Sequence, residues 1–319
     1  MRITIPFAAV VLLGTLAPWH FGAQEPFRSG ARSVAVYATV TDEMGRPITD
    51  LTRDDFEVYD NGKRQTITLF ESGAQPITVV LMLDRSGSMQ GNFGLVRSAV
   101  EHFVGRMAPG DKARIGSFAN RIQVDPREFT SSQRDLVEIL RTQLQEAGPT
   151  PLWNAVNVGI TSLLHQDGRR VVVVFTDGID LPMNGSSRNI SLKDAMKHAE
   201  QEDVMVYAIG LASSRGYGRR QRGGGRRSRG MRSIIAEQDK PDPGLPKIAQ
   251  STGGNYFELT QASDLSATFS RVLDELRRQY AIAFTPEKLD GKTHKLEARV
   301  RKPGATVRTR RSYVAKADR

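Results

Sequence analysis

Short apolar runs alternate with amphipathic segments from Pro76 onwards, and this order constrains the fold more than any other feature of the chain. Runs that are apolar throughout are typical of strands covered on both faces, and the spacing within the amphipathic segments is that of helices. Strands that alternate with helices predict an α/β fold with a doubly wound, mostly parallel sheet flanked by helices. The strands are expected at residues 78–83, 113–118, 171–175 and 204–209, and the helices at residues 95–107, 134–145, 152–164, 192–202, near 245, and at 263–278.

Three oxygen-bearing side chains follow the first of these strands at alternate positions. Asp84, Ser86 and Ser88 stand at i, i+2 and i+4 in the stretch VVLMLDRSGSMQ, where the apolar run ends. Positions two apart share one side of an extended segment, and open α/β sheets bind ligands at the carboxyl ends of their strands. A hard divalent cation such as Mg²⁺ requires oxygen ligands. The pattern therefore indicates a metal site at this edge of the sheet.

Two further oxygen ligands follow in an order known from one protein family. Thr150 stands in GPTPLWNAV, and Asp177 stands in VVVVFTDGID at the end of a later apolar run. Together with the first three residues they resemble the metal-ion-dependent adhesion site (MIDAS) of von Willebrand factor type A (VWFA) domains. The resemblance implies that the hydroxyls ligate Mg²⁺, or Mn²⁺, directly or through water, and that the aspartates act mostly through water. The implied metal site consists of Asp84, Ser86, Ser88, Thr150 and Asp177.

The resemblance also implies a function. Because the three hydroxyl ligands are neutral, the bound metal would keep excess positive charge and an open coordination position. A carboxylate from a partner would fill that position, so we expect an adhesion or scaffold protein that grips an Asp or Glu of a macromolecular partner, most simply another protein. Asp180 matches no position of the motif and is interpreted as a loop residue.

Enzymatic alternatives find less support in the sequence. A phosphatase with an aspartate nucleophile after the first strand usually needs a second acid two residues later, where this chain has Ser86. The P-loop pattern of ATPases does not occur, and no constellation of serine, histidine and aspartate stands out among the five histidines. We therefore predict a binding protein and not an enzyme, with a metal-dependent hydrolase as one alternative.

Strand-like segments flank the VWFA-like domain, which is assigned to residues 76–278. Residues 33–75 alternate apolar and polar side chains between turn signals, and the pair Asn61-Gly62 is typical of a two-residue hairpin. Residues 279–314 return to this pattern, and residues 289–300 are interpreted as a hairpin or loop between two strands. Each segment is too small to bury a core alone. The two are therefore expected to pack together as a small accessory β unit.

The flanking segments also resemble those of a bacterial subfamily. TDEMGRPITDLTRDDFEVYDNGKRQTI in the first segment, and LRRQYAIAFTP after the last helix, are similar to exported bacterial proteins described as VWFA-related, which are common in acidobacteria. The similarity extends over about residues 33–314, apart from one insertion. It implies an exported protein with a VWFA domain between two β segments.

The first residues have the pattern of a secretory signal peptide. Arg2 precedes an apolar run at residues 3–16, and small residues near Ala17 and Ala23 suit cleavage, so residues 1–23 are assigned to the signal. The apolar run is shorter than the roughly 18 residues that cross a bilayer, so no transmembrane anchor is predicted. The chain has no cysteine and hence no disulfide framework. A secreted or periplasmic protein is expected.

One basic segment interrupts the domain. Residues 213–232 contain eight arginines and no acidic residue, and so account for eight of the ten net positive charges of the chain. Glycine lowers helix propensity and like charges repel, so residues 213–243 are predicted to be a flexible Arg/Gly-rich insertion. Because arginine-rich segments can fold on RNA, the second alternative function is the binding of a polyanion or nucleic acid. A solvated surface loop is the other interpretation of this segment.

Overall fold

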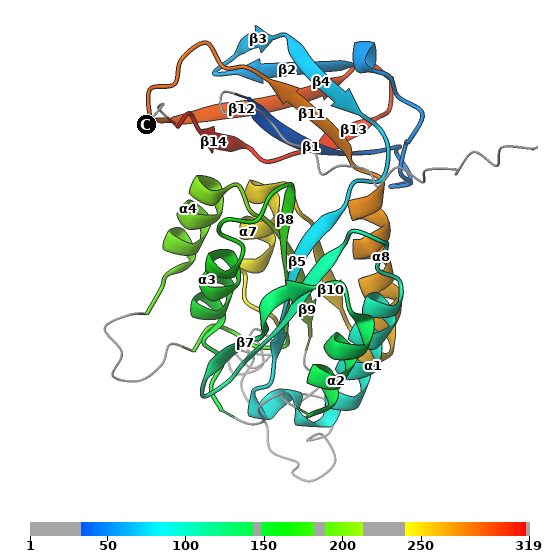
Figure 1. Cartoon of the computed structure of the whole chain (residues 1–319), viewed down its shortest axis with the longest axis vertical. Coiled ribbons are helices and arrows are strands. Elements are labelled where there is room, and N and C mark those ends of the chain that lie inside the picture. Colours follow the sequence, from blue (N-terminus) through cyan, green and yellow to red (C-terminus); the bar gives the residue numbers. More distant parts are fainter. Residues whose placement is uncertain (1–32, 143–147, 182–188, 213–239, 317–319) are drawn as a thin grey trace, which may run out of the picture.

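The computed structural model describes residues 33–142, 148–181, 189–212 and 240–316. They form two units that lie one above the other in Figure 1, an α/β unit and a smaller unit built mainly of strands. The predicted signal peptide at residues 1–23, and residues 213–239 of the predicted insertion, lie outside the described residues and stay predictions. The end of that insertion is described and differs from the prediction of a flexible segment, because Pro241 and Asp242 are buried and Asp242 accepts hydrogen bonds from two backbone N–H groups. Among the helices that are described, none has both the length and the apolar character needed to span a membrane.

A six-stranded mixed sheet forms the centre of the α/β unit, with the strand order β10-β9-β8-β5-β6-β7. Neighbouring strands are parallel except for β7, which runs antiparallel to β6 at one edge. Every residue of the central strand β5 is buried, as an apolar run covered on both faces requires. The predicted doubly wound, mostly parallel sheet is therefore confirmed. Its strands are β5 (Ile77–Asp84), β6 (Lys112–Phe118), β7 (Ile122–Thr130), β8 (Arg169–Thr176), β9 (Met205–Leu211) and β10 (Tyr256–Leu259).

The two edge strands of this sheet have no counterpart among the predicted elements. β7 contains Pro126 and several charged residues, and none of its side chains is fully buried. β10 has only four residues. Edge strands are covered on fewer sides than central ones, so their sequences lack the continuous apolar run that identifies β5 and β8.

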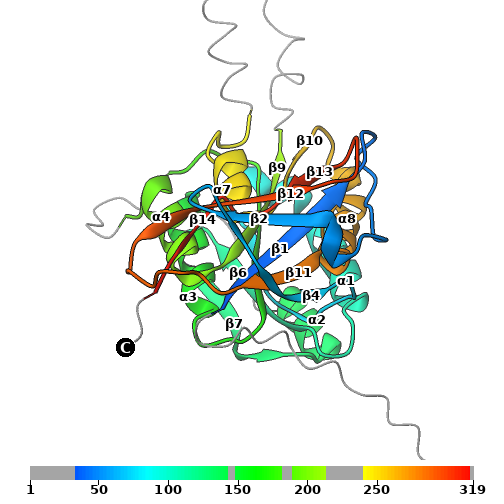
Figure 2. The ribbon, with the colours of Figure 1, turned by 90° about the horizontal axis from the view of Figure 1, so that it is seen from above.

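Helices cover both faces of the sheet, as Figures 1 and 2 show. On one face α1 packs against α2 and α8, and on the other face α4 packs against α3 and α7. The predicted helices agree with these to within two residues, except at the end of α2, where residues 143–147 lie outside the described chain. The helices are α1 (Phe93–Gly105), α2 (Gln133–Thr142), α3 (Leu152–Ser162), α4 (Leu192–Glu202), α7 (Leu245–Thr252) and α8 (Leu265–Arg277).

Alternate side chains of β5 enter two separate cores. Val79, Leu81 and Leu83 join the cluster beneath α1, α2 and α8. Val80 and Met82 join the cluster beneath α3, α4 and α7. Burial of a side chain of this size contributes about 1.5–3 kcal/mol, so β5 is held from both sides. Its carboxyl end, where the candidate ligands begin, is correspondingly well fixed.

The second unit is a β sandwich built from both flanking segments. Its two sheets have the orders β13-β1-β11-β4 and β14-β12-β2-β3 and share one apolar core. β1 of the first segment pairs with β11 of the second, and β2 pairs with β12. The expected accessory unit made by both segments is therefore confirmed. Its strands are β1 (Val34–Thr41), β2 (Phe56–Asp60), β3 (Lys63–Gln65), β4 (Ile67–Glu71), β11 (Tyr280–Phe284), β12 (Thr293–Val300), β13 (Thr306–Arg308) and β14 (Ser312–Val314).

The predicted hairpin at Asn61-Gly62 is confirmed. These two residues join β2 to β3, with φ angles of 47° and 82°. A two-residue turn that matches the twist of its strands needs such positive values, which Asn and Gly adopt most easily.

The hairpin or loop predicted over residues 289–300 is wrong. Residues Thr293–Val300 form strand β12, and the preceding strand β11 lies in the other sheet, so the two strands do not form a hairpin. β11 is already paired on both sides, with β1 and β4. The chain therefore crosses to the second sheet, where Leu296 and Val300 of β12 join the shared core and Ala298 between them is buried.

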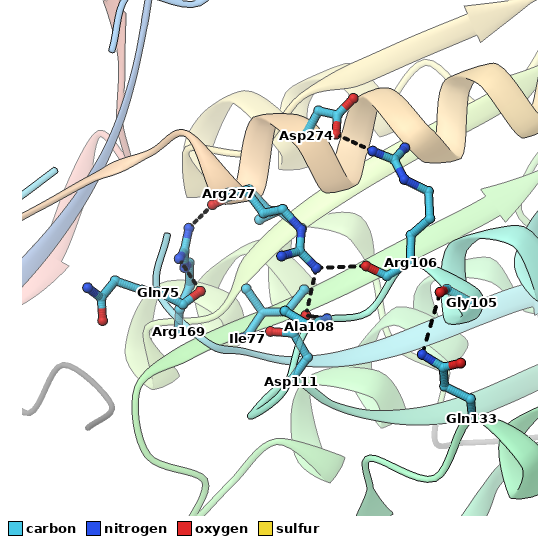
Figure 3. Close-up of polar contacts among 11 residues, drawn as sticks. Gln75, Ile77, Gly105, Arg106, Ala108, Asp111, Gln133, Arg169, Asp274 and Arg277 are labelled. Carbon is cyan, nitrogen blue, oxygen red and sulfur yellow. Dashed lines mark hydrogen bonds and ion pairs between the residues drawn. The ribbon is translucent and has the colours of Figure 1, made fainter. Parts of the chain in front are cut away.

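A buried carboxylate fixes the place where β5 begins, as Figure 3 shows. Asp111 is 3% exposed. Its Oδ1 accepts a hydrogen bond from the backbone N–H of Ile77 at 3.0 Å, and its Oδ2 accepts one from Ala108 at 2.7 Å. Arg277, the last residue of α8, donates to the same Oδ2 at 3.1 Å. The β sandwich lies at this end of the α/β unit, so the carboxyl ends of the parallel strands lie at the opposite end.

Replacing Asp111 with alanine is expected to lower the free energy of unfolding by about 3 kcal/mol, because two backbone donors and the Arg277 guanidinium lose their acceptor. Urea denaturation of both proteins measures the change. The matched control is Asp274→Ala, which removes the nearby ion pair with Arg106, in which both side chains are about 40% exposed. Such a surface pair contributes less than about 1 kcal/mol. Equal effects of the two substitutions would contradict the structural role of Asp111.

Candidate metal centre

The carboxyl ends of β5 and β8 place two of the candidate aspartates close together. Asp84 is the last residue of β5, and Asp177 directly follows Thr176, the last residue of the neighbouring parallel strand β8. Asp84 is fully buried. Its Oδ2 accepts a hydrogen bond from Thr176 Oγ1 at 2.5 Å, and its Oδ1 accepts one from the backbone N–H of Ser86 at 2.8 Å. The carboxylate is therefore fixed from two sides.

Two serine hydroxyls lie between the aspartates. Ser86 Oγ lies 2.9 Å from Ser88 Oγ, and Ser88 Oγ donates to Asp177 Oδ1 at 2.7 Å. Ser88 belongs to the short 3₁₀ helix η2 (Gly87–Asn92), for which Ser86 is the flanking residue. Asp84, Ser86, Ser88 and Asp177 thus form one connected group of oxygen-bearing side chains at the strand ends.

Thr150 approaches the same group from a third loop. A β-carbon added to Gly178, the residue after Asp177, would lie 3.2 Å from Thr150 Oγ1 and 3.3 Å from its Cγ2. The backbone N–H of Leu181 donates to the Thr150 carbonyl at 2.8 Å. The side chain of Thr150 therefore packs directly against the backbone that follows Asp177, and all five candidate residues lie at the same end of the sheet.

The electrostatics of this group suit a cation. Burial raises the pKa of Asp84 to about 6, because desolvation disfavours the charged carboxylate. Hydrogen bonds from Thr176 and Ser86 lower the pKa in part, and the neighbouring charge of Asp177 raises it. A cation among these oxygens would offset the cost of burying the charge.

The donor set fits a hard divalent ion. In the part of the chain that the structure describes, no three His, Cys, Asp or Glu side chains gather in a group that could hold a metal. A metal at the strand ends would therefore depend on the hydroxyls as well as the two carboxylates. Carboxylate and neutral oxygen ligands are the chemistry that Mg²⁺ accepts, usually with waters completing its shell.

Two residues at the site were not identified from the sequence. Thr176, which holds Asp84, directly precedes Asp177 in the stretch FTDG, so its place at a strand end was the only available signal. Asp180 lies in a loop, as interpreted, but it also has a specific contact. Its Oδ1 accepts a hydrogen bond from the backbone N–H of Trp153 at 3.2 Å, in the first turn of α3.

Comparison with known proteins identifies one family. The model of the von Willebrand factor type A domain matches residues 78–271, which is more than half of the chain. A search of curated proteins finds no match.

Solved structures with similarity to the chain include three from different sources. An aerotolerance-related membrane protein from Bacteroides fragilis is 18% identical, with a TM-score of 0.43, and the match covers 63% of this chain and 98% of that one. Proximal thread matrix protein 1 from the mussel byssus, with a zinc-occupied MIDAS motif, is 18% identical, with a TM-score of 0.48. The match covers 68% of this chain and 50% of the mussel protein. A von Willebrand factor type A protein from Catenulispora acidiphila is 11% identical, with a TM-score of 0.47. The match covers 91% of this chain and 75% of that one. The chain thus spans about half of the mussel protein.

Proposed function

The chain belongs to the von Willebrand factor type A domain family, and from this premise we propose that it is an exported, metal-dependent binding module of the adhesion or scaffold type. In this proposal, Mg²⁺ or Mn²⁺ is held by the five candidate residues, and a partner protein supplies an aspartate or glutamate. The single observation that supports it best is the series of contacts from Asp84 through Ser86 and Ser88 to Asp177 at the strand ends.

The protein's own groups have distinct roles in this proposal. Ser86, Ser88 and Thr150 offer neutral hydroxyl oxygens, while Asp177 accepts from Ser88 and so orients that hydroxyl. Asp84 orients the Ser86 backbone through its Oδ1. A divalent ion bound there would supply positive charge that neutral ligands do not cancel, and this charge recognises a carboxylate.

Exposed apolar side chains beside the site support a protein partner. Ile179 is 42% exposed and Leu181 is 56% exposed, and both lie in the loop that follows Asp177. Neighbouring exposed apolar side chains rimmed by polar residues are typical of sites that bind other proteins.

We further propose the domain organisation and the subfamily. The VWFA domain is assigned to residues 76–278, and the accessory β unit to residues 33–75 and 279–314. Membership of the exported bacterial VWFA-related subfamily is supported by the sequence of these two segments, which surround the domain in the same order.

Affinity capture from the native cell-envelope fraction tests the function. The immobilised protein is expected to retain partner proteins in Mg²⁺ and to release them in a chelator. Amidation of the accessible carboxylates of the fraction should abolish retention, because the proposed ligand group is a carboxylate. Retention that is unaffected by both the chelator and the amidation would contradict the proposal.

Matched serine variants assign the retention to the proposed site. Ser88→Ala removes a hydroxyl that contacts both Ser86 and Asp177, and retention is expected to fall to background. Ser263→Ala removes an exposed hydroxyl near the start of α8, and retention is expected to stay unchanged.

A second candidate function is the binding of a polyanion through the Arg/Gly-rich insertion. It is favoured by one observation, the eight arginines without an acidic residue between positions 213 and 232. A cationic segment of this composition attracts phosphate or sulfate groups without specific geometry. This function is independent of the metal site, so one protein can have both.

A further inference from the structure

The amino end of α3 depends on an acceptor from a distant loop. The residue before the helix is Pro151, which has no side-chain acceptor and makes no capping hydrogen bond. The first N–H groups of a helix have no partner within the helix and need one from outside. Asp180 supplies it, since its Oδ1 accepts from the backbone N–H of Trp153 at 3.2 Å. Thr150, two residues before α3, is therefore held near the loop that contains Asp177 and Asp180.

A second carboxylate holds that loop in turn. Asp242 is 7% exposed and lies at the end of the predicted insertion, three residues before α7. Its Oδ2 accepts from the backbone N–H of Asp180 at 3.0 Å, and its own N–H donates to the carbonyl of Gly178 at 3.2 Å. Its Oδ1 accepts from the N–H of Gly244 at 2.8 Å. Asp242 therefore contacts the Asp177 loop at both Gly178 and Asp180 and ties it to the start of α7.

The segment around Asp242 also packs against α3. A β-carbon on Gly244 would lie 2.5 Å from a ring carbon of Trp153, so the tryptophan ring rests directly on this backbone. Trp153 is 4% exposed. The loops that carry Asp177 and Thr150, which come from different parts of the chain, are thus joined through one buried set of contacts.

We infer that Asp180 and Asp242 are positioning residues of the metal site: they hold Asp177 and Thr150 at the distance that a shared metal ion requires. The inference rests on the proposed function. Asp84, Ser86 and Ser88 come from one continuous stretch, whose geometry the chain itself fixes. Asp177 and Thr150 have no such local constraint, and residues that orient metal ligands typically change metal affinity by 10- to 100-fold when they are replaced.

Asparagine is the informative replacement for both aspartates. Both oxygens of Asp242 accept from backbone N–H groups. In Asp242→Asn one of these oxygens becomes an amide NH₂ that faces another donor, so one contact is lost while the size of the side chain is kept. The matched control is Asp54→Asn, an exposed position in the β sandwich with the same change of charge.

Calorimetric titration with Mg²⁺ and with Mn²⁺ tests the inference on the full-length protein. Asp242→Asn and Asp180→Asn are expected to weaken affinity about tenfold or more, and Asp54→Asn is expected to leave it unchanged. Thermal melts in chelator run in parallel. A lowered melting temperature with wild-type affinity in both variants would show a purely structural role and overturn the inference.

The remaining outcomes separate this inference from the proposed function. If Asp242→Asn does not fold, the titration of Asp180→Asn decides, because Asp180 is less deeply buried and its carboxylate contacts only the start of α3 among the elements named above. If the wild-type protein binds Mg²⁺ or Mn²⁺ and a folded Asp180→Asn protein binds it with the same affinity, the positioning role is overturned and the proposed function stays intact. A wild-type protein that binds neither ion would overturn both.

Discussion

Replacing Asp84 with alanine is expected to abolish binding of Mg²⁺ and Mn²⁺ while the protein still folds. Asp84 orients Ser86 and contacts Thr176, and with Asp177 it supplies the negative charge of the proposed site. Loss of this carboxylate removes both the charge and the orientation of a ligand, so the affinity is expected to fall by more than a hundredfold.

The protein is expected to fold without the Asp84 carboxylate, although this side chain is fully buried. Alanine leaves the Thr176 hydroxyl and the Ser86 N–H without their acceptor, which costs about 1–3 kcal/mol. Burial raises the pKa of Asp84 from 3.8 to about 6. Because the folded state holds the proton more tightly than the unfolded state, the free energy of unfolding falls as the pH rises from about 4 to about 6. At neutral pH the ionised carboxylate lowers it by roughly 3 kcal/mol. Alanine relieves that cost, so the two effects largely cancel.

Calorimetric titration measures the loss of Mg²⁺ and Mn²⁺ affinity, and thermal melts in chelator measure whether the variant folds. Asp54→Ala serves as the control, because its side chain is exposed in the other unit. Unchanged Mg²⁺ and Mn²⁺ affinity in a folded Asp84→Ala protein would contradict the metal site. An unfolded variant would instead show that the acceptor role of Asp84 outweighs the cost of its buried charge.

Local periodicity made part of this site predictable. Asp84, Ser86 and Ser88 follow a strand whose apolar side chains face two cores, and such a strand is visible in the sequence without knowledge of its neighbours. The Asn61-Gly62 turn is equally local, since its two positive φ angles depend on these two residues. Features of this kind are encoded within a few residues.

Contacts between distant residues gave no such signal. Asp242 accepts from the N–H of Asp180 across 62 positions, and nothing in the adjoining sequence distinguishes either residue from an ordinary loop aspartate. The alternation of apolar and polar side chains in β12 could be seen in the sequence, but the sheet to which β12 belongs could not be predicted from it. The choice of partner strand depends on residues of β2 more than two hundred positions earlier, which fill the same core as Leu296.

Deleting residues 215–232 is expected to leave the fold and the metal affinity intact and to lower the affinity for heparin on the order of a thousandfold at low salt. The chain on either side is fixed by described contacts. The N–H of Ala212 donates to the carbonyl of Leu259 at 2.8 Å, and Asp242 is held as described above. A β-carbon on Gly210 would lie 2.8 Å from Pro241, so the two flanks of the deletion lie close together. The residues that remain at 213–214 and 233–239 can span roughly 30 Å, which is enough to join them.

The affinity should fall because eight positive charges are removed without any acidic residue. Binding of a cationic segment to a polyanion releases counterions, so the dependence of affinity on salt becomes shallower as positive charges are lost. A salt-gradient elution from heparin and a titration with RNA measure this for both proteins. A variant in which all eight arginines are lysines keeps the charge and is expected to elute close to the wild type.

Unchanged elution of the deletion variant would show that the arginines make no contact with the polyanion. A collapse of its thermal melt would show that the segment is part of the fold, against the prediction from its composition.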